Sequence, residues 1–171
     1  MIITRDSYRS APWKNGRGTT FEIVDSGDVA PHWRLSLAMI SGEGVFSDFS
    51  GYDRTIVKLA GGGLTIAFDG GGSEKLCVLT PRSFAGERRV KYCVTDGPVQ
   101  AINVMTLRGS YVHTVQVVPG APIPPAARER SQTFLYVLEG RNAGDTLRLH
   151  GVSTSRNLPS GIYVVIRSLT A

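Results

Sequence analysis

Three arginines and one asparagine stand in or beside apolar, strand-like stretches, where a polar side chain needs a partner. The arginines are Arg34, Arg54 and Arg108, and Asn103 interrupts the apolar stretch 99–106. A guanidinium presents a planar fork of N–H donors that can bind a carboxylate through two parallel hydrogen bonds. These residue types therefore suit the recognition of a small carboxylic acid, such as a dicarboxylate or an amino-acid derivative.

The alternation of side chains along 101–105 predicts which way these polar groups face. If Ile102 and Val104 face one core, Asn103 and Met105 face the opposite side, because successive side chains of a strand point to opposite faces. We expect that opposite side to be the interior of a β-barrel. An arginine facing this interior needs a negative partner, because an unpaired buried charge costs several kcal/mol.

Two sources could supply that negative charge. Asp48 and Asp53 lie close to Arg54 in the sequence, and a ligand carboxylate is the other source. Arginines that face solvent at alternate strand positions are the simpler interpretation, and for Arg34 both interpretations stay open. For Arg54 and Arg108 we favour a pocket or the shell that supports it.

The loop 13–16 brings four different contact groups together. Trp13 offers an aromatic wall, Lys14 an ammonium group, Asn15 an amide, and Gly16 an exposed backbone N–H. Loops carried on a rigid scaffold commonly hold binding residues. Ser47 adds a hydroxyl group further along the chain. For Lys14 the alternative is a solvated side chain without a ligand.

No pattern in the chain predicts a nucleophile or a phosphate-binding loop. A Gly-x-Ser-x-Gly elbow is missing, and neither Cys77 nor Cys93 has a histidine near it in the sequence. The glycines of 16–18 lack the lysine pattern of a phosphate loop, and we interpret the glycine triplet 61–63 as a turn. We therefore predict no catalytic residue.

The composition is typical of a globular chain rich in strands. Hydrophobic residues make up 42% of the 171 residues, enough for a packed interior, and charged residues only 19%, too few for a disordered chain. Twenty glycines and nine prolines interrupt the chain often and argue against long helices. The net charge of +5 favours small anions and nucleic acid alike.

Period-two alternation recurs along the chain and predicts many short strands. Asp96 and Gly97, between apolar stretches, predict a hairpin turn. Only 124–131 looks briefly helical, and the proline-rich segment 119–125 is interpreted as a connection between two lobes. The expected strands are 33–38, 54–60, 64–68, 76–79, 99–106, 111–118, 134–138, 146–150 and 162–167.

A weak internal repeat favours the same two-lobe organisation. The stretch 56–61 resembles 135–140, and 81–84 resembles 159–162 further downstream. Two β-barrel lobes made by duplication would produce this repeat, and chance similarity between two hairpins is the alternative. The expected lobes are 1–118, with an N-terminal strand and loop, and 119–171, completed by strands from the first half.

Four blocks of sequence resemble the HutD/Ves family. They are Pro-Trp-Lys-Asn-Gly-Arg-Gly-Thr-Thr at 12–20, Trp-Arg-Leu-Ser-Leu-Ala at 33–38, Phe-Ser-Asp-Phe-Ser-Gly-Tyr-Asp-Arg-Thr at 46–55, and Asn-Val-Met-Thr at 103–106 with the following Arg108. The resemblance thins out after Arg108. Arg17 stands where the family has a glycine, Val45 and Ser50 stand where it has prolines, and Leu107 stands where an arginine is common.

The resemblance implies an all-β fold of the RmlC-like cupin type, a double-stranded β-helix or jelly roll. Two fused β-barrel lobes with very little helix would make the chain a bicupin. The resemblance also implies a metal-free accessory or regulatory protein of bacterial histidine utilisation. Its ligand would be a small anionic metabolite similar to formylglutamate or urocanate.

A metal centre has little support in the sequence. Metal-binding cupins use a His-x-His pair and a later histidine, whose side chains converge on the ion. His32, His113 and His150 lie far apart, and Ile162 stands where the last of those ligands would be. We predict no metal and no cofactor, although three histidines from distant strands could still assemble a site.

These considerations select nine candidate ligand-binding residues. Lysine and arginine side chains would meet ligand carboxylates, the polar groups would bind an amide or formyl end, and the tryptophan and methionine would form apolar walls. The candidates are Trp13, Lys14, Asn15, Gly16, Ser47, Arg54, Asn103, Met105 and Arg108.

Other functions stay open beside a binding protein. A cupin enzyme of the isomerase or hydrolase class would act on a small carboxylated metabolite, and a protein-interaction module would expose an apolar patch. We expect no nucleic-acid partner, because the basic clusters 88–91 and 128–130 lack interleaved aromatic residues.

We also expect no membrane partner, since the apolar stretches 134–138 and 162–166 are too short to span a bilayer. The start of the chain lacks a signal-peptide pattern, so we expect a cytoplasmic protein. Exposed strand edges would permit a homodimer.

Overall fold

The computed structural model describes residues 1–13, 16–118, 131–149 and 159–169, which form thirteen β-strands and one short 3-10 helix, η1 (Arg5–Ser7). No α-helix occurs among these residues, so the predicted all-β class is confirmed. The strands are β1 (Ile2–Ile3), β2 (Arg9–Pro12), β3 (Gly18–Asp25), β4 (Trp33–Ile40), β5 (Glu43–Val45), β6 (Tyr52–Phe68), β7 (Ser73–Lys75), β8 (Pro81–Ala85), β9 (Val90–Leu107), β10 (Tyr111–Val118), β11 (Ser131–Val137), β12 (Thr146–Leu149) and β13 (Gly161–Ser168).

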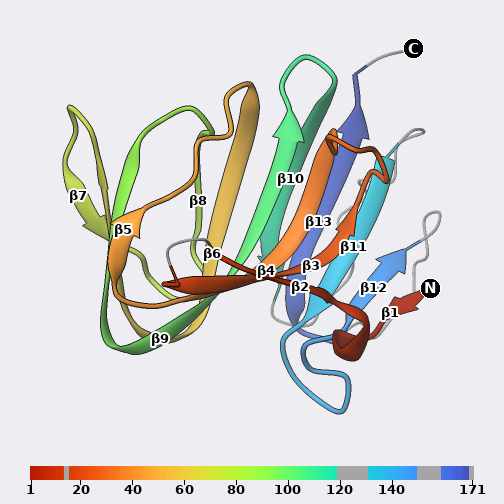
Figure 1. Ribbon diagram of the computed structural model, residues 1–171. Coiled ribbons are helices and arrows are strands. Elements are labelled where there is room, and N and C mark those ends of the chain that lie inside the picture. Colours follow the sequence, from red (N-terminus) through yellow and green to blue (C-terminus); the bar gives the residue numbers. More distant parts are fainter. Residues whose placement is uncertain (14–15, 119–130, 150–158, 170–171) are drawn as a thin grey trace.

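The strands form two antiparallel sheets that lie side by side in the molecule (Figure 1). The larger sheet has the order β2-β3-β4-β9-β6-β7, with β5 paired to β9 and β8 paired to β6. The smaller sheet has the order β1-β12-β11-β13-β10. We interpret the two sheets as the two lobes of the predicted bicupin.

Two strands from the first part of the chain, β1 and β10, belong to the smaller sheet. β1 pairs with β12, and β10 pairs with β13 over its whole length, although β1 and β10 both precede position 119. The predicted lobe boundary between 118 and 119 stays a prediction. Most of the segment expected to be helical, 124–130, and the proline-rich connection lie outside the described residues.

The long strands β6 and β9 bend together, and this bend curls the larger sheet. Their register shifts twice, between Lys58 and Ala60 and between Gly61 and Gly63. A Cβ atom at Gly62 would lie 1.9 Å from the Thr95 carbonyl oxygen, so only glycine allows this close approach. The triplet 61–63 is therefore a double bulge inside β6, and the turn predicted there is wrong.

The opposite strand adapts to this bend without reversing. Asp96 and Gly97 have φ angles of 61° and 97°, yet β9 continues through both residues. The hairpin predicted from Asp-Gly is therefore wrong. Left-handed backbone at these two successive positions kinks β9 opposite the bulges of β6. The two strands still pair on both sides of the kink.

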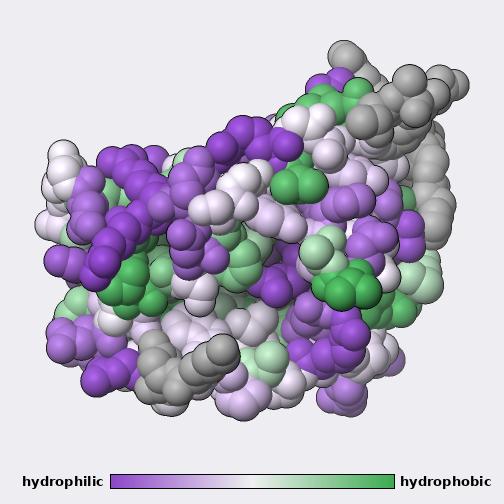
Figure 2. Space-filling model, turned by 45° about the horizontal axis from the view of Figure 1, so that its top comes forward, coloured by the Kyte–Doolittle hydropathy of each residue, from purple (hydrophilic) through white to green (hydrophobic). Residues whose placement is uncertain are grey.

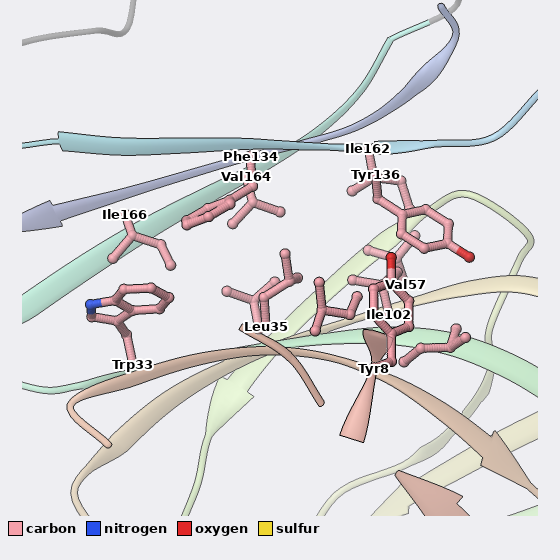
Figure 3. Close-up of a cluster of buried hydrophobic side chains, with 13 residues drawn as sticks. Tyr8, Trp33, Leu35, Val57, Ile102, Phe134, Tyr136, Ile162, Val164 and Ile166 are labelled. Carbon is pink, nitrogen blue, oxygen red and sulfur yellow. The ribbon is translucent and has the colours of Figure 1, made fainter. Parts of the chain in front are cut away.

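The main apolar core lies between the two sheets (Figure 3). Trp33 and Leu35 of β4 and Ile102 of β9 face Phe134 and Val164 of the smaller sheet. The rings of Trp33 and Phe134 are 5.6 Å apart between centroids. This contact fixes one face of β4 and β9, so their alternate side chains must point away from it, into the larger sheet's own curl.

A second apolar core fills part of that curl. It is built from buried side chains of the larger sheet, including Ile40, Phe46, Ile56, Leu64 and Tyr92. Not all of the space is packed, and the remainder forms the cavity described below. No helix among the described residues has the length and apolar character to cross a lipid bilayer.

Candidate functional site

The antiparallel register places two arginines in one row across three strands. Arg34 of β4 is opposite Met105 of β9, and Met105 is opposite Arg54 of β6. The next row on the same face contains Ser36 and Asn103. The predicted alternation is therefore correct, since Asn103 and Met105 face away from the core between the sheets. The same alternation directs Arg34 and Arg54 into the curl of the larger sheet.

These rows form the floor of a cavity of about 1150 Å³. Its lining combines aromatic and aliphatic side chains with charged ones from β2, β3, β4 and β6. On the molecular face drawn in Figure 2, hydrophobic side chains likewise lie recessed between hydrophilic ones. Five lining residues matter most for the chemistry: Trp13, Arg34, Ser47, Arg54 and Asn103.

Arg54 is buried among aromatic rings and is only 5% exposed. Its guanidinium carbon lies 5.6 Å from the ring centroid of Phe46 and 5.1 Å from those of Phe49 and Phe84. Nη1 donates a hydrogen bond of 3.2 Å to the Ser47 carbonyl oxygen. The ring faces stabilise the cation in part, since an aromatic face is electrostatically negative.

A second guanidinium lies close to the first. Arg34 is 5.4 Å from the same Phe49 ring, and its Nη2 is 3.5 Å from the Met105 sulfur. Burial, and secondarily the charge of Arg34, lower the pKa of Arg54 to about 10. Within the described part of the chain, neither arginine has an acidic side chain within ion-pair distance.

The cavity floor also holds polar atoms that lack partners. The Nε atoms of Arg34 and Arg54 and the Oδ1 atom of Asn103 are buried and have no hydrogen-bond partner among the described residues. Buried polar atoms are nearly always hydrogen-bonded, so such atoms need an explanation. An acid group with a neighbouring N–H or O–H would offer acceptors to the two guanidinium groups and a donor to the asparagine amide.

Trp13 closes one side of this space. Its Nε1 donates to the Thr20 hydroxyl at 2.8 Å, and its ring meets Phe46 edge-on at 6.4 Å between centroids. A Cβ atom at Gly18 would lie 2.8 Å from the ring, which explains a glycine at that position. The indole is thus held in place by its N–H and by packing.

The other predicted site residues have different positions. Ser47 lines the cavity, while Gly16 is exposed with a φ angle of 68° and does not line it. Met105 is buried between the two arginines and is not part of the lining. Lys14 and Asn15 lie outside the described residues, so their predicted roles stay predictions.

Arg108 lies away from the cavity, on the exterior. Its guanidinium binds Asp53 at 3.0 Å and Glu87 at 2.9 Å. This arginine holds the pKa of the Glu87 carboxyl down to about 2. The reason is positional: Arg108 follows the last residue of β9, beyond the rows that face inward. Asp53, which we considered as a partner for Arg54, is therefore paired with Arg108 instead, and we leave Arg108 out of the site.

Sequence reasoning missed the acidic side of the cavity. Glu22 and Asp25 of β3 line it together with Arg9 of β2. In a regular strand residues 22 and 25 would face opposite sides, and a register shift between Glu22 and Val24 brings both inward. No signal in the sequence marks this bulge.

A separate polar cluster lies in a cavity of about 650 Å³ beside β6, β8 and β10. The Thr55 hydroxyl is 2.7 Å from the Ser83 hydroxyl and 2.8 Å from Nε2 of His113. The other ring nitrogen of His113 is 2.7 Å from the Thr106 hydroxyl. Burial lowers the pKa of His113, so the ring is neutral at pH 7 and connects β10 to the larger sheet.

The described residues contain no group of three or more histidine, cysteine, aspartate or glutamate side chains that could hold a metal ion. His32 pairs with Asp28 at 3.5 Å on the surface, and His150 lies outside the described residues.

Comparisons with known proteins agree with this architecture. A family model described as HutD matches residues 5–158. A Pseudomonas putida protein, described as an uncharacterized 21.2 kDa protein in the hutC 3′ region, is 37% identical over 108 residues, which are 61% of this chain and 57% of that protein. Protein Ves of Cronobacter sakazakii is 36% identical over 132 residues, 75% of this chain and 70% of that protein.

Two solved structures match over nearly the whole chain. HutD from Pseudomonas fluorescens SBW25 has a TM-score of 0.85 at 25% identity, with 99% of both chains covered. A conserved protein of unknown function from Pseudomonas aeruginosa PAO1 has a TM-score of 0.82 at 24% identity, with 99% of this chain and 98% of that chain covered. In sequence, the matches to the P. putida protein and to protein Ves of Citrobacter koseri span 57% and 52% of those proteins, about half their length. The predicted family is confirmed: this chain belongs to the HutD family.

Proposed function

We propose that this protein binds a small anionic metabolite, without a metal, in the cavity of its larger sheet. The observation that carries the proposal is the pair of inward-facing guanidiniums, Arg34 and Arg54, neither of which has a carboxylate within ion-pair distance among the described residues. A buried cation without a counterion is costly, and a ligand carboxylate would remove that cost while forming bidentate hydrogen bonds.

The role we propose is buffering or sensing of an intermediate of histidine utilisation in the cytoplasm. Support comes from the family and from the description of the P. putida relative, which places that protein beside hutC. Formylglutamate and urocanate are the ligands to test first, because each combines a carboxylate with a polar nitrogen group. Asn103 would accept a hydrogen bond from that nitrogen group, and Trp13 would pack against the ligand's apolar atoms.

Binding rather than catalysis fits the described lining best. A proton-transfer enzyme needs an acid or base aimed at the substrate. No histidine is among the residues that line this cavity in the described part of the chain. Of its carboxylates, Glu22 and Asp25 share the guanidinium of Arg9, and Asp28 lies 3.5 Å from the ring of His32 at the surface. His113 lies in the other cavity, with both ring nitrogens hydrogen-bonded to threonines.

The test is isothermal titration calorimetry with formylglutamate, urocanate and glutamate, followed by thermal unfolding with each ligand. We expect at least one to bind with a dissociation constant in the micromolar to low millimolar range and to raise the melting temperature. The matched control is Arg108→Met, which removes an arginine outside the cavity. No heat and no stabilisation at millimolar concentrations of all three would count against the proposal.

A further inference from the structure

The cavity carries opposite charges at its two ends. Arg34 and Arg54 lie on β4 and β6, while Glu22 and Asp25 lie on β3. Asp25 is directly opposite Arg34 in the β3–β4 register, yet the two side chains do not form an ion pair. The acidic end on β3 and the basic end on β4 and β6 are therefore adjacent within one cavity, without an ion pair between them.

The acidic end keeps an excess of negative charge. Arg9 binds both carboxylates, through Nη2 to Glu22 and at 3.1 Å to Asp25. One guanidinium thus serves two carboxylates, and Asp28, which also lines the cavity and lies 3.5 Å from His32, adds to the negative charge there. Asp25 is held further by the backbone N–H of Gly27 at 2.8 Å. At the opposite end, two guanidiniums have no acidic partner among the described residues.

Burial differs between these groups in a way that points to a ligand. The side chains of Glu22 and Asp25 are 20% and 16% exposed, whereas that of Arg9 is 75% exposed. The carboxylates thus lie mostly inside the cavity, and Arg9 reaches them from solvent. A solvated arginine is easily displaced, because an exposed ion pair contributes little binding energy. Arg54, at the far end, is nearly fully buried and has an unpartnered Nε atom.

We infer that the ligand of this cavity is a zwitterion: a carboxylate bound by Arg34 and Arg54, joined to a cationic nitrogen bound by Glu22 and Asp25. This inference rests on the proposed function: it keeps the ligand's carboxylate and adds a cationic nitrogen, so a dipolar molecule is preferred to a simple anion such as formylglutamate. The two binding ends are on strands separated by at most three inter-strand steps of about 4.8 Å. Because the side chains point inward from these strands, the carboxylate and the nitrogen would lie within about 10 Å of each other.

Arg9 then acts as a stand-in for the ligand's cation. When the cavity is empty, its guanidinium neutralises part of the acidic end; when the ligand enters, the ligand's nitrogen takes over those contacts. Arg9 is therefore a competitor of the ligand. The alternative, in which Glu22 and Asp25 only anchor Arg9 to hold β2 against β3, makes a different prediction for an Arg9 substitution.

Three linear probes of similar length test the inference: 5-aminovalerate, valerate and glutarate, which are a zwitterion, a monoanion and a dianion. Their affinities are measured by calorimetry at constant ionic strength, because salt screens partly exposed charges. We expect 5-aminovalerate to bind roughly tenfold more tightly than either other probe, the effect of about one partly buried ion pair.

Variants at the acidic end sharpen the test. Glu22→Gln with Asp25→Asn should remove the preference for 5-aminovalerate while leaving valerate binding nearly unchanged. Arg9→Gln should strengthen 5-aminovalerate binding severalfold, because it removes the competitor. A purely structural role of these residues would weaken all probes together in both variants. Circular dichroism checks that each variant is folded. If the double variant does not fold, Arg9→Gln alone still tests the inference.

The outcomes separate the two proposals. If valerate or glutarate binds as tightly as 5-aminovalerate, or if Arg9→Gln weakens the zwitterion, the inference is wrong and the anion site remains. If no probe and none of the three metabolites binds, the proposed function fails and the inference fails with it.

Discussion

Replacing Arg54 by methionine should separate ligand binding from folding. Methionine keeps a long, flexible, apolar side chain among the three phenylalanine rings and removes the charge. We expect the free energy of unfolding of Arg54→Met to equal that of the wild type or to exceed it by up to about 2 kcal/mol. Substitutions of buried residues more often destabilise a protein.

The magnitude follows from the surroundings of Arg54. Burial and the charge of Arg34 lower its pKa to about 10, more than two pKa units below the ordinary value for arginine, and each unit is about 1.4 kcal/mol. Holding the charged form in place therefore costs about 3 kcal/mol. The folded state binds this proton less tightly than the unfolded chain, so stability rises with pH only from about pH 10 upward. The cost is therefore present in full at pH 7.

Favourable contacts offset this cost. Three cation–π contacts contribute about 2 kcal/mol together, and the hydrogen bond to the Ser47 carbonyl contributes about 1 kcal/mol. The charged side chain thus adds almost nothing to stability in the absence of ligand. A methionine loses these contacts but also the desolvation cost, and its apolar packing supplies the expected gain.

The assay is urea unfolding with and without a carboxylate ligand. At a ligand concentration of 100 times the dissociation constant, the wild type should gain about 2.7 kcal/mol and Arg54→Met close to nothing. Arg108→Met is the control, and its ligand-dependent gain should match the wild type. A loss of 3 kcal/mol or more in Arg54→Met would refute the reasoning, because it would mean that the variant leaves a buried partner charge unpaired. Equal ligand stabilisation of both proteins would refute it too.

Three further predictions use other parts of the structure. Burial holds the pKa of His113 below its ordinary value, so below about pH 6.5 the unfolded chain takes up a proton more readily than the folded chain. The free energy of unfolding should therefore decrease as the pH falls from about 7 to about 5. His113→Asn should show a smaller decrease over the same range in urea unfolding. Gly62→Ala should lower the free energy of unfolding by more than about 2 kcal/mol, since its Cβ would lie 1.9 Å from the Thr95 carbonyl oxygen. The control Gly72→Ala, whose Cβ would have nothing within 4 Å, should be nearly neutral. A Gly62→Ala variant as stable as the wild type would contradict the bulge. Asn103→Leu should not reduce stability, because its buried Oδ1 has no partner, yet it should weaken ligand binding roughly tenfold in calorimetry; unchanged affinity would remove Asn103 from the site.

Local alternation predicted the part of the site that lies on regular strands. The pattern around Ile102 and Val104 placed Asn103 inward, and it did so because the core between the sheets fixes one face of β9. Arg54 was favoured through its matched block instead, and its pairing with Met105 places it on the same face. Where strands stay regular, a period of two carries side-chain direction from the sequence to the fold.

The features that the sequence did not predict lie where the backbone of a strand is irregular. The glycine triplet 61–63 and Asp96-Gly97 resemble turns locally, and only the pairing of β6 with β9 makes them a shared bend. Glu22 and Asp25 face one cavity because of a bulge that depends on the pairing of β3 with β4. Bulges are set by tertiary pairing, so a single sequence gives little sign of them.

The position of the arginines at strand ends was equally hard to foresee. Arg108 follows the matched block 103–106, as Arg54 lies within the matched block 46–55, yet Arg108 lies just past the end of β9. There the chain leaves the sheet, and Asp53 and Glu87 bind the guanidinium outside the cavity. An arginine one residue beyond the end of a strand can thus lie outside the cavity, although the arginines within the neighbouring strands face into it.

A crystal structure of the protein with a carboxylate ligand that binds in calorimetry tests the central claim most directly. The account predicts carboxylate oxygens within hydrogen-bond distance of both the Arg34 and the Arg54 guanidiniums, over Met105 and beneath Trp13. A ligand found in the cavity beside His113, or on the exterior at Arg108, with the two inner arginines untouched, would contradict it.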